Sequence, residues 1–138
     1  MNQQVFVYRH RVHYAYCTLG NHIYYSRFLD LLEAARGEMF RQLDQTFLRW
    51  QEEGCLFPIV EVHLRYQRPA RYDDELEIAL WLTRLERVRL NFGCRIRNQR
   101  AETVLEGETW HVCTSLEEKP RRLPSGLEAA LRPYLKAV

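Results

Sequence analysis

The hydrophobic pattern of the chain changes its period near residue 26. Residues 5–15 alternate apolar and polar side chains, which is typical of a half-buried strand. From Ser26 onward, apolar residues fall three and four positions apart, which predicts a helix with one face in a core and Ser26 as its N-cap. The apolar positions of this helix are Phe28, Leu31, Leu32, Ala35, Met39, Phe40 and Leu43.

Beyond this helix the pattern is mostly that of strands. A short helical or irregular piece is expected over 44–53, because Gly54 is a natural helix stop. Four alternating segments then follow at short spacings, as in an antiparallel meander. These strands are expected over 58–68, 75–85, 89–98 and 103–114, and a short amphipathic helix over 127–135 closes the chain.

A strand, a long helix and four strands make an α+β order. One long helix is best buried against a five-stranded antiparallel sheet when the sheet wraps around it. The chain has 138 residues and no linker-like or repetitive segment, so we expect a single domain over 1–138.

Composition narrows the class of protein. The formal net charge is +2, and the 20 basic residues are spread among 18 acidic ones, which argues against a nucleic-acid binder. No apolar run approaches the roughly 18 residues that span a membrane. The cysteines lie far apart and nothing resembles a signal peptide, so we expect a reduced, cytoplasmic setting. They are Cys17, Cys55, Cys94 and Cys113.

The junction between the first strand and the helix is the best place for a small-molecule site. If the helix begins between His22 and Ser26, the backbone N–H groups of residues 20–23 lie at its N-terminus, where negative charge is favoured. Gly20 would let a ligand approach the backbone closely. These amides are therefore candidates for an oxyanion hole, although an ordinary loop-to-helix turn has the same sequence features.

Two motifs support a family assignment. The helix carries Glu33, Arg36 and Glu38 after the pair Tyr24-Tyr25, and residues 66–74 read YQRPARYDD. This layout resembles the hotdog-fold thioesterases of the 4-hydroxybenzoyl-CoA thioesterase family over nearly the whole chain. The resemblance implies a hotdog fold, an acyl-CoA or acyl carrier protein substrate, and a homodimer or homotetramer with its site between subunits.

The catalytic aspartate of that family is replaced here by Thr18. Threonine can hold a water molecule, but it has no group that is ionised at neutral pH. In lacking the acid the chain resembles the thioesterases of enediyne polyketide biosynthesis, which implies that Asn21 and Arg36 position the carbonyl. The base would be Glu33, paired with Arg36 one turn away, or His22. A structural ion pair and a hydrogen-bonding loop histidine are the alternatives.

The remaining candidates would bind substrate. Ile23 and the tyrosines at 16, 24 and 25 would line the pocket, although aromatic residues beside a core helix often only pack. Arg87 and Arg89 would meet the phosphates of a carrier. The histidines at 10, 13, 63 and 111 lie in alternating strands without a metal-ligand spacing, so no metal and no cofactor is expected.

The sequence thus predicts hydrolysis of an acyl thioester to a free carboxylic acid. The rival is a non-catalytic protein of the same fold that binds an acyl thioester or acyl chain. A dehydratase of this fold would need a catalytic histidine or acid aimed at a β-hydroxyacyl group, and its usual pairs are missing.

Overall fold

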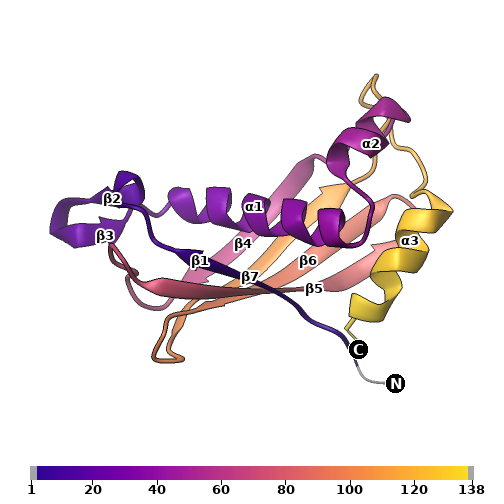
Figure 1. The fold of residues 1–138 in the computed structure, drawn as a ribbon. Coiled ribbons are helices and arrows are strands. Elements are labelled where there is room, and N and C mark those ends of the chain that lie inside the picture. Colours follow the sequence, from indigo (N-terminus) through magenta and orange to yellow (C-terminus); the bar gives the residue numbers. More distant parts are fainter. Residues whose placement is uncertain (1–2, 137–138) are drawn as a thin grey trace.

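The computed structural model describes residues 3–136, and its main feature is a five-stranded antiparallel sheet with one long helix across one face (Figure 1). The strand order, β1-β5-β6-β7-β4, brings the first and the second long strands of the chain to the two edges. This is the expected α+β hotdog arrangement. The bounds are β1 (Phe6–Arg11), β4 (Ile59–Tyr66), β5 (Glu75–Glu86), β6 (Arg89–Arg97) and β7 (Thr103–Val112).

Helix α1 (Arg27–Gln42) lies in the concave side of this sheet and forms the core with it. Its apolar stripe is buried as predicted, and Arg36 is buried with it. The inner face of the sheet supplies the other half of the core, for example Leu80 and Ile96, which are fully buried. Ser26 precedes the helix but its side chain caps no backbone N–H, so its predicted capping role is wrong.

The first strand is shorter than the predicted 5–15, because the chain turns after Arg11. It passes through two 3₁₀ turns and a two-stranded ribbon before the helix begins. The ribbon extends from the sheet beside the N-terminal end of α1, at the left of Figure 1. These elements are η1 (Tyr14–Tyr16), β2 (Cys17–Thr18), η2 (Leu19–Asn21) and β3 (His22–Ile23).

The other predicted helices are confirmed with shifted bounds. Helix α2 (Phe47–Glu52) begins after Thr46, whose hydroxyl accepts a hydrogen bond from the Arg49 N–H at 3.3 Å. It ends before Gly54, whose φ of 86° suits a helix stop. The last helix, α3 (Ser125–Leu131), continues into a 3₁₀ turn, η3 (Arg132–Tyr134). Over residues 3–136, no helix combines the length and the apolar character needed to cross a membrane.

The edge strand β4 is unusually open. The predicted alternation is present, but seven of its eight residues are exposed, and only Leu64 is partly buried. Its outer edge pairs with no strand in the part of the chain that the structure describes. Exposed apolar side chains on such an edge are a template for pairing with another strand. They are Ile59, Val60 and Val62, which are 39% to 46% exposed.

Candidate functional site

A cavity lined by both polar and apolar residues opens between α1, α2 and the inner face of the sheet. Its volume is about 470 Å³, which suits a small acyl group. Four phenylalanines contribute to its apolar wall, and a few polar side chains lie among the apolar ones. The phenylalanines are Phe40, Phe47, Phe57 and Phe92, and the polar residues of α1 and β7 are Asp30, Glu33, Arg36 and His111.

Arg36 is the only predicted site residue that is buried and also borders this cavity. Its side chain is directed inward, and its Nη1 donates to the Thr109 hydroxyl at 3.4 Å. Burial lowers the pKa of the Arg36 guanidinium, while the nearby Glu33 carboxylate raises it. Within residues 3–136 no carboxylate forms a salt bridge with Arg36, so the expected Glu33–Arg36 pair is wrong. Glu33 stays exposed at the rim of the cavity because it lies on the outer side of the helix.

Two residues that the sequence analysis did not select connect to Arg36: Thr109 accepts its hydrogen bond, and His111 lines the same cavity. Thr109 and His111 lie two positions apart on β7 and therefore share its inner face. His111 Nε2 lies 3.0 Å from Thr109 Oγ1, and its Nδ1 lies 3.2 Å from the Phe57 carbonyl oxygen. Burial lowers the pKa of His111 to about 4, and the Arg36 charge acts in the same direction. His111 is thus a neutral imidazole at physiological pH.

The predicted loop site forms a separate place in the molecule. A shallow hollow of about 550 Å³ is lined by Tyr14 and the ribbon residues 17–21, but by none of the helix residues. Thr18 is exposed here, and Gly20 has a φ of 77°, which glycine adopts without strain. Arg36 lies nine residues beyond the first residue of α1, which is about 13 Å of helix rise. One protomer therefore does not bring Thr18 and Arg36 together.

Asn21 is engaged in holding the loop. Its Oδ1 accepts the Tyr72 N–H at 3.3 Å, and its φ of 60° closes the turn. Beside it, Arg71 Nη1 donates to the Gly20 carbonyl at 3.3 Å. These bonds tie the ribbon to residues 71–72, which lie beside it. The Asn21 side chain has only its amide N–H groups left for a ligand.

The turn before α1 uses one of the amides that were expected to form an oxyanion hole, that of Ile23, and the neighbouring amide of Tyr24. The Ile23 N–H donates to the Ala70 carbonyl at 2.8 Å, and the Tyr24 N–H donates to the Tyr16 carbonyl at 3.0 Å. The helix begins only at Arg27, whose N–H donates to Tyr24 at 2.8 Å. The amides available to a substrate are therefore narrowed to those of the turn around Gly20.

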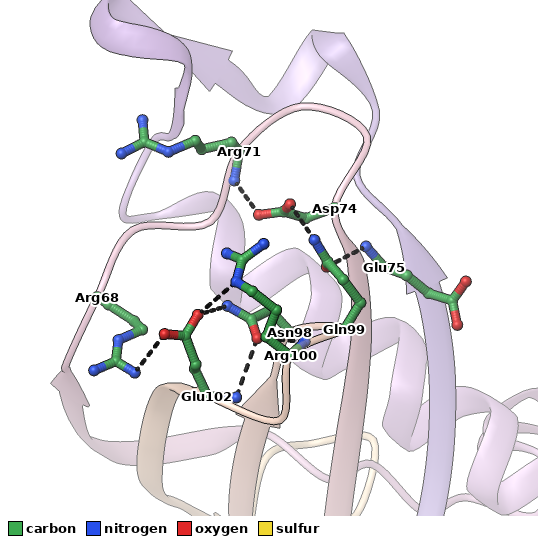
Figure 2. A network of polar contacts seen from close by, with 8 residues as sticks. All are labelled: Arg68, Arg71, Asp74, Glu75, Asn98, Gln99, Arg100 and Glu102. Carbon is green, nitrogen blue, oxygen red and sulfur yellow. Dashed lines mark hydrogen bonds and ion pairs between the residues drawn. The ribbon is translucent and has the colours of Figure 1, made fainter.

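A polar network braces this loop from behind (Figure 2). The Asp74 carboxylate accepts the Arg71 N–H at 2.9 Å and the Gln99 side-chain amide at 3.0 Å. Gln99 in turn accepts the Glu75 N–H at 3.1 Å. The tip of the β6–β7 hairpin thus holds the segment that carries Arg71. Arg71 then contacts the Gly20 carbonyl, so the network fixes the position of the ribbon.

The aromatic candidates lie at the entrance to α1. Tyr16 is half-buried, and the Arg27 guanidinium lies 5.8 Å from its ring centre. Tyr24 and Tyr25 are exposed, with ring centres 4.8 Å apart. The Tyr66 hydroxyl donates to the Tyr25 carbonyl at 3.1 Å. These tyrosines border the ribbon and do not line the 470 Å³ cavity.

His22 and the candidate phosphate-binding arginines occupy other positions. His22 is half-buried on β3, with its ring beside Gly20, where an added Cβ would lie 3.7 Å from Nε2. Arg87 and Arg89 lie at the β5–β6 turn, where Arg87 has a φ of 53°. The Arg87 carbonyl accepts the Leu123 N–H at 2.8 Å, and the Arg87 residue is exposed.

Sequence comparison shows what the chain is similar to. Residues 12–131 match the family described as the thioesterase-like superfamily. The acyl-CoA thioester hydrolase YbgC of Escherichia coli is 32% identical over 133 residues, which cover 96% of this chain and 99% of that protein.

Comparison of structures gives the same fold. A 1,4-dihydroxy-2-naphthoyl-CoA thioesterase of Synechocystis, Slr0204, superposes with a TM-score of 0.87 at 22% identity, covering 94% of this chain and 96% of that one. The dynemicin thioesterase, whose crystal structures reveal induced-fit effects upon polyene binding, superposes with a TM-score of 0.89 at 18% identity, covering 98% of this chain and 100% of that one. At these identities the likeness concerns the fold alone.

Proposed function

The chain belongs to the thioesterase-like superfamily, and on that premise we propose that it hydrolyses an acyl thioester to a free carboxylic acid. The similarity to an acyl-CoA thioester hydrolase over nearly the full length of both chains supports this activity. Coenzyme A is the proposed carrier, with an acyl carrier protein as the second candidate. The single observation that carries the proposal within the structure is the buried Arg36 guanidinium at the wall of the aromatic cavity.

Arg36 is only 5% exposed and has a neutral hydroxyl as its hydrogen-bond partner. A buried charge without an opposite charge is costly, and an oxygen acceptor supplied by a ligand would offset that cost. A thioester has such an acceptor in its carbonyl oxygen, next to an apolar acyl chain. The cavity offers both kinds of surface, since phenylalanines and the Arg36 guanidinium line it together.

The hydrolytic step needs water and a base. In the proposed reaction, water attacks the thioester carbon and a carboxylate accepts its proton. The carbon–sulfur bond then breaks, and the carboxylate passes this proton to the departing sulfur, which leaves as the thiol. Glu33 is the favoured base because it borders the same cavity as Arg36. Thr18, which would orient a water molecule, and His22, the alternative base, lie on the ribbon, so they would reach this cavity only from a second copy.

We also propose that the protein acts as a homodimer joined along β4. The outer edge of β4 is unpaired and carries exposed apolar side chains, and a second copy of this edge would pair with it antiparallel. Ile59 at the start of β4 also borders the cavity. A partner at this edge would therefore cover the cavity as well as the strand.

The test is an assay across acyl-CoA chain lengths, together with acyl carrier protein thioesters, for the wild type and Arg36→Lys. Lysine keeps the charge but cannot reproduce the forked donors of arginine, so kcat/KM should fall about 10- to 100-fold. Arg41→Lys is the matched control, because Arg41 lies on the same helix, is exposed and pairs with Glu38 at 3.5 Å.

The outcome separates the enzyme from its rival. Saturable binding of every acyl-CoA without turnover would overturn the hydrolase proposal and favour an acyl-thioester binding protein. Turnover that Arg36→Lys leaves unchanged would exclude Arg36 from the site. A parallel loss of melting temperature in Arg36→Lys, but not in Arg41→Lys, would mean that Arg36 is structural.

A further inference from the structure

A chain of three side chains crosses the inner wall of the cavity, from the segment before β4 to helix α1. Arg36 is bonded to Thr109, Thr109 to His111, and His111 to the Phe57 carbonyl. The three side chains belong to residues that are at most 5% exposed. The sequence separation is large, with 73 positions between Arg36 and Thr109.

The direction of each hydrogen bond follows from the chemistry of the groups. The Phe57 carbonyl can only accept, so His111 Nδ1 carries the proton. A neutral imidazole has one N–H, which makes Nε2 an acceptor for the Thr109 hydroxyl. The Thr109 oxygen then has its lone pairs free for the Arg36 N–H. All three bonds thus agree with a single arrangement of protons.

This arrangement requires a neutral His111. Among the groups that face it, the Arg36 guanidinium on α1 favours the neutral state. The Asp30 and Glu33 carboxylates line the same cavity and would favour the protonated state, but both are exposed; the Cys55 thiol lines the cavity as well. Burial and the Arg36 charge both lower the pKa of His111. A proton on Nε2 would reverse the bond to Thr109 and place a second positive charge beside Arg36.

The Arg36 guanidinium has two potential partners, the Glu33 carboxylate and the Thr109 hydroxyl. Glu33 lies three residues earlier on the same helix, at a spacing that commonly gives an ion pair. The guanidinium instead extends inward to a hydroxyl, although its pKa still senses the Glu33 charge. Within residues 3–136, the Thr109 hydroxyl is thus the side-chain hydrogen-bond partner of Arg36.

We propose that Thr109 and His111 are positioning residues that direct the Arg36 guanidinium into the cavity, where its remaining donors hold the oxygen of an acyl thioester. The proposal rests on the proposed function, and it assigns no bond-making role to either residue. Neither side chain is needed as acid or base, because both act through Arg36. Loss of the hydroxyl would release Arg36 toward Glu33 and remove its donors from the substrate.

The experiment uses a matched pair at one position. Thr109→Val keeps the shape and removes the hydroxyl, whereas Thr109→Ser keeps the hydroxyl and removes a methyl group. We expect kcat/KM to fall about 10-fold in Thr109→Val, as for the loss of one hydrogen bond to a charged group, and to stay within about threefold in Thr109→Ser. Thr109→Ala gives a second variant without the hydroxyl if the valine variant does not fold.

A double-mutant cycle shows whether Thr109 acts through Arg36. Thr109→Val should cost much less in an Arg36→Lys background than alone, because the side chain that it positions has already changed. Fully additive effects would overturn the proposal, and so would a serine variant as impaired as the valine variant. A structural role alone would lower the melting temperature without this coupling.

The outcome also separates this proposal from the hydrolase assignment. If the wild type binds acyl-CoA without turnover, the hydrolase proposal is rejected. The role of Thr109 is then decided by the same double-mutant cycle, with the dissociation constant for acyl-CoA as the measured quantity. If the wild type hydrolyses acyl-CoA and the effects of the two mutations are additive, the hydrolase proposal is kept and the positioning role of Thr109 is rejected. If acyl-CoA neither binds nor reacts, both proposals fall.

Discussion

The neutral, buried His111 should make the protein lose stability in mild acid. Its pKa is about 4 in the folded protein, against 6.5 for an exposed histidine. The unfolded chain therefore binds this proton more readily than the folded one. The contribution of the neutral His111 to the free energy of unfolding is present above pH 6.5 and is lost progressively as the pH falls toward 4.

The size of the loss follows from the shift. The difference of 6.5 − 4, or about 2.5 pKa units, corresponds to a limit of about 3.4 kcal/mol, since each unit is worth about 1.36 kcal/mol. Most of this, roughly 2.5 kcal/mol, should be lost between pH 7 and pH 4.5. A buried imidazole with 4% exposure has little solvent screening to reduce it. His10 adds a loss of the same sign, because burial and the neighbouring His13 lower its pKa too.

Urea unfolding at a fixed protein concentration across this pH range measures the effect. His111→Phe keeps a ring in the wall and removes the titration, so its free energy of unfolding should vary less with pH than that of the wild type. His63→Phe is the control, because the His63 side chain is 57% exposed. If His111→Phe and the wild type show the same pH slope, His111 is not a buried neutral imidazole and its directed bond to Phe57 is wrong.

Two further predictions concern the sheet. Gly107→Ala should destabilise the fold by more than about 2 kcal/mol in urea unfolding, because the new Cβ would overlap the His63 carbonyl on β4. Gly126→Ala is the control and should be nearly neutral, because its new Cβ meets no atom within 4 Å. Equal stabilities of the two variants would refute this packing. Val62→Lys should convert the proposed dimer to a monomer in sedimentation, because it places a charge on the exposed edge strand β4. Val7→Lys, on the opposite edge strand β1, is the control and should leave the dimer intact. A wild type that sediments as a monomer would refute the β4 interface.

The long elements could be predicted from sequence because their burial is recorded in the local period. Phe28 to Phe40 repeat at helical spacing, and the helix that buries them ends one residue before the last predicted apolar position, Leu43. The alternation in 75–85 likewise matches β5, which is one residue longer. In both elements the polarity of each side chain indicates whether that residue is buried or exposed. The fold class can therefore be predicted without knowledge of distant contacts.

The ribbon before α1 could not be predicted in this way. Strands of two residues have no period, and the bonds that hold the ribbon come from far along the chain. Asn21 contacts Tyr72 at a separation of 51 positions, and Ile23 donates to Ala70. The sequence therefore left the helix start open over residues 22–26, whereas His22 and Ile23 form a strand of the ribbon and the helix begins at Arg27.

The same limit explains why His111 was not selected. Within β7 it is one more alternating residue, and its partners Phe57 and Arg36 come from other elements. The one local signal is its spacing of two from Thr109, which places both side chains on the same face of the strand. That signal gains meaning only when Arg36 is known to lie opposite.

The separation of the two candidate regions constrains how any thioester can be held. A carbonyl oxygen accepts hydrogen bonds over about 3 Å, whereas Arg36 lies about 13 Å of helix rise beyond Arg27. Its guanidinium is also directed to Thr109 and not back toward Gly20. In one protomer the turn around Gly20 and Arg36 must therefore contact different parts of a substrate. If both are to hold one carbonyl, they must come from different copies of the chain, so an active monomer would leave Arg36 to recognise the acyl group instead.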